Sequence, residues 1–247
     1  MDTTKMTNPT HQISQMAYAR LAGLLYLLIA ISGGFSIGYM PSVIIAPGDA
    51  IATAQNIAKH QGLFRLGILG DIAVFLMEIA LTVMLYRMFK SISPTLSMIA
   101  AFSRMAMGIV MGLNLFNYLI PINLMSGADY LSAFEPDQLQ TLAMLFLDAH
   151  QDGVYIWGLF FALHLIALGY LIFKSGFFPK ALGVLMMIGS FGYGGESIAA
   201  FTFPDNATIS IVVTVLLVLA VIGELGFTFY LLIKGQAFKG NKKDKNK

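Results

Sequence analysis

The sequence predicts an all-α integral membrane protein, built as a bundle of six transmembrane helices. The chain of 247 residues is 57% hydrophobic and only 11% charged, whereas soluble domains carry about 25% charged residues. Six stretches are also long and apolar enough to cross a hydrocarbon core ~30 Å thick at a rise of ~1.5 Å per residue. These stretches must be helices, because a lone strand in lipid leaves its backbone groups unpaired and nothing in them shows barrel-type alternation.

The six predicted spans differ in the ionisable residues that they hold. The first, 21–40, holds none. In the remaining spans, 66–86 holds Asp71 and Glu78, 96–120 holds Arg104, 153–173 holds His164, 181–203 holds Glu196, and 207–233 holds Glu224. Prolines lie between the spans or at their ends, at positions 41, 94, 121, 179 and 204. Proline interrupts a helix, so these positions are interpreted as helix boundaries.

The distribution of charge predicts the orientation in the membrane. If the N-terminus is cytoplasmic, only Lys59 and Arg65 among the lysines and arginines between spans fall outside, and the outer connections collect aspartates and glutamates. This asymmetry predicts that both termini are cytoplasmic. The domain organisation that follows is a polar N-terminal segment (1–17), a six-helix domain (18–235) and a basic, disordered cytoplasmic tail (236–247). In the outer connection 121–152, apolar residues at helical spacing after Pro136 predict a short amphipathic helix that lies on the outer surface or caps the bundle.

An internal repeat is suggested by two pairs of matching segments. Glu78–Leu85 matches Glu224–Leu231 in its glutamate, threonine and final leucine, and Arg20–Gly34 matches Lys180–Gly194 in its basic residue and glycines. His164–Leu171 fits more loosely. The interpretation is three pseudo-repeated helical hairpins of one orientation around an axis along the membrane normal, a design known among transporters.

Four ionisable side chains are predicted to lie at one depth near the bilayer centre. Glu78, His164 and Glu224 lie nine or ten residues before an inner basic residue, and Arg104 lies ten after Pro94, which places each ~14–15 Å deep. A lone charge there costs about 2.5–3.5 kcal/mol or more, so Arg104 is expected to pair with Glu78 and Glu224. We interpret the four as a polar midplane layer that binds a ligand; the alternative is that they only join helices, or that Arg104 reaches the inner surface.

A second polar group is predicted nearer the outer face. Asp71 shares a helix face with Glu78, seven residues away, and Glu196 lies sixteen residues beyond Lys180. Asp148, His150 and Asp152 precede the span 153–173, so a polar track from the outer mouth to the midplane is a hypothesis. The alternative role of His150 is that of a helix-end residue.

Glycine pairs at a spacing of four predict close helix packing. These are Gly34 with Gly38 and Gly108 with Gly112, together with the glycine-rich run 189–195. Small residues let helix backbones approach one another. The alternative interpretation is a hinge or a notch that faces a substrate.

Several functional classes are excluded or disfavoured. The chain has no cysteine, so disulfides and thiolate metal sites are excluded. Phosphate-loop and HExxH motifs are absent, no histidines are paired at i, i+4, and no cofactor is predicted. The metal site that stays open is a mixed one of His60, His150, Asp148 and Asp152 on the outer side. The outer face lacks the basic surface that nucleic-acid binding requires.

The region 149–185 carries a family resemblance. Its features are Ala149-His150, Gly153, the run 156–161 (IWGLFF), Leu168-Gly169-Tyr170-Leu171, Ser175-Gly176-Phe177, Pro179 and Leu182-Gly183. In these it resembles the bacterial six-helix membrane proteins grouped as domain of unknown function 4386 (DUF4386), and the resemblance extends over nearly all of 18–235. It implies the six-helix fold and a bacterial plasma (inner) membrane, and it brings no substrate, reaction or catalytic residue.

Three functional hypotheses remain from the sequence. The preferred one is a non-enzymatic bundle that binds or moves a small or lipidic molecule through the midplane layer of Glu78, Arg104, His164 and Glu224. The second is an intramembrane enzyme, such as a metal-dependent hydrolase, with an outward-facing site of Asp71, Asp148, His150, Asp152 and Glu196. The third is a regulatory or scaffold subunit. The sequence leaves the oligomeric state open.

Overall fold

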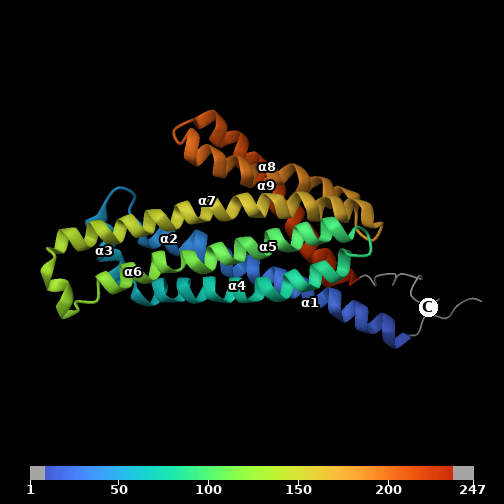
Figure 1. Ribbon diagram of the computed structural model, residues 1–247, viewed down its shortest axis with the longest axis horizontal. Coiled ribbons are helices and arrows are strands. Elements are labelled where there is room, and N and C mark those ends of the chain that lie inside the picture. The colour runs from blue at the N-terminus through green and yellow to red at the C-terminus, as the bar shows by residue number, and fades with distance from the viewer. Residues whose placement is uncertain (1–8, 236–247) are drawn as a thin grey trace, which may run out of the picture.

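The described chain has six long helical segments. Helices α4, α5 and α7 run along the length of the molecule, and α8 and α9 are inclined to them (Figure 1). The computed structural model describes the backbone of residues 9–235 and the side chains of residues 15–235. All regular elements within 9–235 are helical, and in chain order they are α1 (Pro9–Gly33), the π-helix η1 (Gly34–Tyr39), α2 (Met40–Ile44), α3 (Ala50–Lys59), α4 (Gln61–Phe89), α5 (Pro94–Asn114), α6 (Phe116–Leu124), the 3-10 helix η2 (Asp129–Ala133), α7 (Pro136–Ser175), α8 (Lys180–Thr202) and α9 (Ala207–Lys234).

Six segments of the described chain are long and apolar enough to cross a membrane, which confirms the predicted fold class. They are Gln15–Ile44, Gln61–Phe89, Pro94–Leu124, Pro136–Ser175, Lys180–Thr202 and Ala207–Lys234. Helix α1 begins at Pro9, inside the segment 1–17 that the sequence places before the first span. Residues 1–8 and the predicted tail 236–247 lie outside the described residues.

Helix α7 is one continuous helix of 40 residues. The prediction of a separate short helix in the outer connection is therefore wrong. A capping box between Glu135 and Gln138 starts α7, and the sequence holds no proline between Pro136 and Ser175 that would end it. At ~1.5 Å per residue its length is ~60 Å, about twice the hydrocarbon thickness. Its N-terminal part consequently extends beyond the span and packs against α3 and α6.

Two prolines expected at helix boundaries lie within helical segments. Pro41 follows η1 and occupies the start of α2, where the missing N–H breaks no hydrogen bond. Pro121 lies inside α6, which begins after a break at Leu115. Both sites depart from a plain α-helix nearby, and this is how proline is accommodated in long spans.

The six long segments close into a ring. Helix α1 packs against α4, α4 against α5, α5 against α7, α7 against α8, and α8 against α9, which returns to α1. The other end of α9 is joined to α8, and this connection between α8 and α9 projects from the bundle (Figure 1). A ring of six helices encloses space along its axis unless side chains fill it. This space holds the polar residues described below.

The glycines of this ring have two different roles. A Cβ atom added at Gly189 would meet the Ala220 backbone of α9, and one at Gly192 would lie 2.6 Å from the Leu217 nitrogen. Here glycine permits close packing, as predicted. A Cβ atom at Gly34, Gly38 or Gly112 would meet nothing within 4 Å. The packing prediction is wrong for these three, and Gly34 and Gly38 instead line a cavity.

Candidate functional site

Arg104 and Glu78 form an ion pair in the interior of the bundle. Arg104 lies on α5 and Glu78 on α4, and their side chains are 1% and 6% exposed. The Arg104 Nε group faces Glu78 Oε2, and Arg104 Nη2 donates to Glu78 Oε1 over 2.9 Å. This two-point contact matches the planar guanidinium to the planar carboxylate. It explains how both charges persist in an apolar segment.

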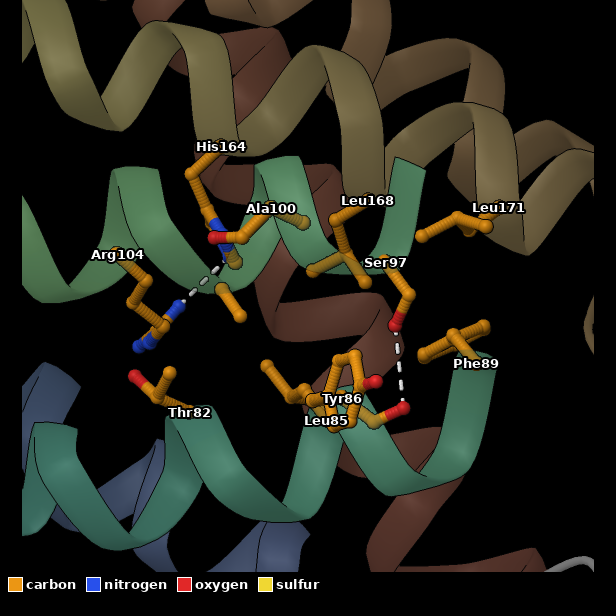
Figure 2. Close-up of a pocket in the computed structure, with 11 residues that line it drawn as sticks. Thr82, Leu85, Tyr86, Phe89, Ser97, Ala100, Arg104, His164, Leu168 and Leu171 are labelled. Carbon is orange, nitrogen blue, oxygen red and sulfur yellow. Dashed lines mark hydrogen bonds between the residues drawn. The ribbon is translucent and has the colours of Figure 1, made fainter. Parts of the chain in front are cut away.

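His164 of α7 holds the same guanidinium from a second direction. Figure 2 shows His164 and Arg104 directed toward each other, with Thr82 of α4 on the far side of Arg104. The His164 Nδ1 atom lies 2.8 Å from the Ala100 carbonyl oxygen. Since a carbonyl only accepts, Nδ1 carries the hydrogen. Nε2 therefore accepts from Arg104 Nη1 over 2.9 Å, and His164 acts as a neutral support for Arg104.

Glu224 of α9 joins this layer through tyrosines. The Tyr26 hydroxyl donates to Glu224 Oε2 over 3.4 Å, and the Tyr193 hydroxyl donates to Oε1 over 3.5 Å. Both bonds are long. The Arg104 guanidinium carbon lies 4.8 Å from the Tyr26 ring centroid, so Tyr26 lies between Arg104 and Glu224. The expected direct pairing of Arg104 with Glu224 is absent from the ion pairs of the described residues.

A cavity of about 570 Å³ lies beside this layer. It is lined by residues of α1, η1, α4, α5, α7, α8 and α9, and it opens at the surface where Gly34, Gly38 and Gln151 are exposed. Its walls include Tyr26, Gly34, Gly38, Asp71, Glu78, Arg104, Gln151, Trp157, Phe161, Tyr193, Glu196, Glu224 and Thr228. A volume of this size lies within the range of small-molecule sites, which is ~300–1,000 Å³. The pocket of Figure 2, on the other side of Arg104, has only about 10 Å³ and is too small for an organic ligand.

The cavity wall combines carboxylates with aromatic rings. Asp71, Glu78, Glu196 and Glu224 contribute carboxyl groups, and Arg104 contributes a guanidinium. Trp157 stacks on Phe161 with ring centroids 4.8 Å apart, and Tyr193 meets Phe161 edge-on at 4.7 Å. These rings form one continuous wall between α7 and α8. The arrangement can hold a molecule that has both an apolar body and a polar group.

Asp71 and His150 lie together at the end of the site away from the connection between α4 and α5. The Asp71 Oδ2 atom of α4 lies 3.6 Å from His150 Nε2 of α7, and both side chains are buried. The His150 ring stacks on Tyr118 of α6 with centroids 3.6 Å apart, and Asn114 of α5 donates to the His150 carbonyl over 2.8 Å. His150 is thus an interior residue and not simply the end of a helix.

The predicted outer group is divided by the structure. Asp148 and Asp152 are exposed, because residues two positions apart on a helix point ~200° apart. They therefore cannot share the inward face of His150. Glu196 lies on α8 and lines the cavity with Asp71. Among the described residues no group of three or more histidines, aspartates or glutamates is placed to hold a metal ion. A hydrolase site built from all five outer residues has no geometric support.

Sequence reasoning missed the residues that connect the charged groups. Tyr26 lies in a span that carries no charge, and nothing local distinguishes it from other aromatic residues. Tyr193 and Trp157 are similarly hidden in apolar runs. One signal was available: Tyr193 lies three residues before Glu196, so both occupy one face of α8.

The six spans and the interior polar cavity define the class, a multi-pass integral membrane protein. The chain belongs to the family described as Domain of unknown function (DUF4386), which matches residues 21–235. That range contains every residue of the cavity wall. An uncharacterized protein of Archaeoglobus fulgidus is 37% identical over 78 residues, which make up 32% of this chain and 43% of that protein. The chain therefore spans less than half the length of this relative. No solved structure matches the chain.

Proposed function

We propose that this protein binds or moves a small or lipidic molecule in its central cavity. The observation that carries the proposal is the cavity of about 570 Å³ adjoining Glu78, Arg104 and Glu224. If these polar side chains only joined the helices, the space between them would be expected to be filled, because protein interiors are close-packed. His164 does not line this cavity, so we assign it to the support of Arg104.

The one tryptophan of the chain provides a direct assay, because Trp157 lines the cavity. Bromine quenches indole fluorescence on contact. We therefore expect at least one of three brominated amphiphiles to quench Trp157 saturably in lipid nanodiscs. The probes are ω-bromodecyltrimethylammonium, ω-bromodecanol and ω-bromodecanoate, which share one chain and differ in head group. Quenching that only rises in proportion to the probe in the membrane would contradict the proposal.

A leucine at Gly34 should block this quenching. Gly34 lines the cavity, and a Cβ atom there has open space, so the side chain of Gly34→Leu is expected to extend into the site. We expect the saturable component to weaken about tenfold or more, which corresponds to ~1.4 kcal/mol of binding free energy. Gly112→Leu is the matched control, because its Cβ position is also open and it is not part of the cavity wall. Equal binding by both variants would show that the probe binds elsewhere.

We further propose a bacterial plasma membrane location with both termini in the cytoplasm. The charge asymmetry supports this orientation, and the first and last long helices pack together. The chain has no native cysteine, so single cysteines report position without background. In intact cells a membrane-impermeant maleimide should label Ser132→Cys in η2 and spare Ser91→Cys, which follows α4; both serines are exposed. The reverse labelling pattern would invert the topology.

The three-hairpin repeat is part of the same proposal. Glu78 and Glu224 correspond in the matched segments, and both line the cavity. Equivalent positions around one axis would explain why two different spans contribute a glutamate to one space. Failure of the three hairpins to superpose with Glu78 and Glu224 at equivalent positions would exclude the repeat.

A further inference from the structure

We propose that the molecule taken by this cavity is an organic cation with an apolar body, such as an alkylammonium compound. The inference rests on the proposed function and names its substrate class. Four side chains of the cavity wall are carboxylic acids, and one is a guanidinium. A site with this excess of acidic groups favours a positive ligand and disfavours a negative one.

Arg104 cannot readily serve an anionic ligand. It is 1% exposed, and its donors are directed at Glu78 and His164. The Tyr26 ring lies beside its guanidinium, 4.8 Å from centroid to carbon. An incoming carboxylate or phosphate would have to displace Glu78, which would leave that carboxylate buried without its partner. Such a loss is strongly unfavourable.

Glu224, in contrast, forms no direct ion pair within the described part of the chain, since Tyr26 lies between it and Arg104. Its carboxylate receives only the two long tyrosine hydrogen bonds at 3.4 and 3.5 Å. It is partly exposed to the cavity that it lines. A carboxylate in an apolar bundle is stabilised by a countercharge, and a bound cation would supply one.

Two further features of the wall point to a ligand. Trp157, Phe161 and Tyr193 form an aromatic surface in the same cavity as Glu224, and aromatic faces attract ammonium groups, tryptophan most strongly. Thr228, one turn from Glu224, is 1% exposed, lines the cavity, and its hydroxyl has no hydrogen-bond partner. Asp71 is likewise buried in this wall, and neither of its carboxylate oxygens accepts a hydrogen bond. A ligand with an ammonium head and an apolar chain would meet both the carboxylates and the rings.

The three brominated probes test this assignment in the whole protein in nanodiscs. We expect ω-bromodecyltrimethylammonium to quench Trp157 at a concentration at least tenfold lower than ω-bromodecanol or ω-bromodecanoate. Glu224→Gln keeps the shape of the side chain and removes its charge, so it should weaken the cation about tenfold or more and leave the alcohol unchanged. Asp148→Asn is the control, because this carboxylate is exposed and outside the cavity wall.

The outcomes separate the two proposals. Saturable quenching by the alcohol or the carboxylate with equal or greater affinity would overturn the cation assignment and leave the binding function intact. Saturable quenching by none of the three probes would overturn both. If Glu224→Gln does not fold, Glu196→Gln provides a second test within the same wall, because it also removes a negative charge and should weaken the cation while leaving the alcohol unchanged. Unchanged cation affinity in every folded wall variant would also refute the assignment.

Discussion

Arg104→Met is expected to lower the free energy of unfolding by about 3–5 kcal/mol, the usual cost of removing one partner from a buried ion pair. The substitution leaves the Glu78 carboxylate in the bundle without a cation and removes the donor to His164 Nε2. Thermal or denaturant unfolding of the detergent-solubilised protein measures the effect. Glu78→Gln should destabilise less, because its amide oxygen can still accept from Arg104 Nη2.

A double variant distinguishes a broken pair from a damaged core. Glu78→Leu combined with Arg104→Met removes both charges and keeps apolar volume, so it should recover most of the stability lost in Arg104→Met. Arg65→Met controls for loss of an arginine, because Arg65 is exposed and surface substitutions usually change stability by less than ~0.5 kcal/mol. If Arg104→Met is as stable as the wild type, the Arg104–Glu78 ion pair does not stabilise the bundle, and the prediction is wrong.

The spans could be predicted because their physical cause is local. A run of apolar residues must be helical in lipid whatever surrounds it. That Glu78, Arg104 and His164 lie at one level of the bundle could be predicted for a similar reason, since counting residues from a helix end fixes position along the helix. The structure does place these three side chains in direct contact.

The angular positions around each helix were harder to predict. Height alone placed Asp148, His150 and Asp152 together, and helical geometry then directs the two aspartates away from the histidine. Glu224 lines the same cavity as Glu78 and Arg104, but Tyr26 separates it from Arg104. A cavity is a property of the whole ring. No single span contains the information that Gly34, Trp157 and Glu196 share one wall.

The predicted helix boundaries were wrong at two prolines that were taken to end a span. Pro41 and Pro121 are accommodated by an adjacent π-helix and an adjacent break. The tertiary neighbours, and not the local preference, decide whether a proline ends a span. The π-helix also presents Gly34 and Gly38 to the cavity, a placement consistent with the frequent occurrence of π-bulges at functional sites.

Gly189→Leu is expected to lower the free energy of unfolding by about 3 kcal/mol or more. A Cβ atom at Gly189 would lie against backbone atoms of Ala220 in α9 and 2.6 Å from the Ala220 Cβ. Backbone atoms cannot rotate away as a side chain does, so α8 and α9 must separate. Overpacking of this kind typically costs ~1–3 kcal/mol and sometimes more. Unfolding of the detergent-solubilised variant measures the loss.

Gly189→Ala makes the argument sharper, because alanine adds only the clashing carbon. Alanine is favoured over glycine in a helix interior by ~1 kcal/mol, so any destabilisation by Gly189→Ala must come from contact with α9. Gly112→Ala has the same gain in helix preference and an open Cβ position, so it should be neutral or stabilising. If the two alanine variants unfold alike, α8 and α9 are not packed as closely as the structure shows. The placement of Tyr193 and Glu224 in one cavity wall would then be wrong as well.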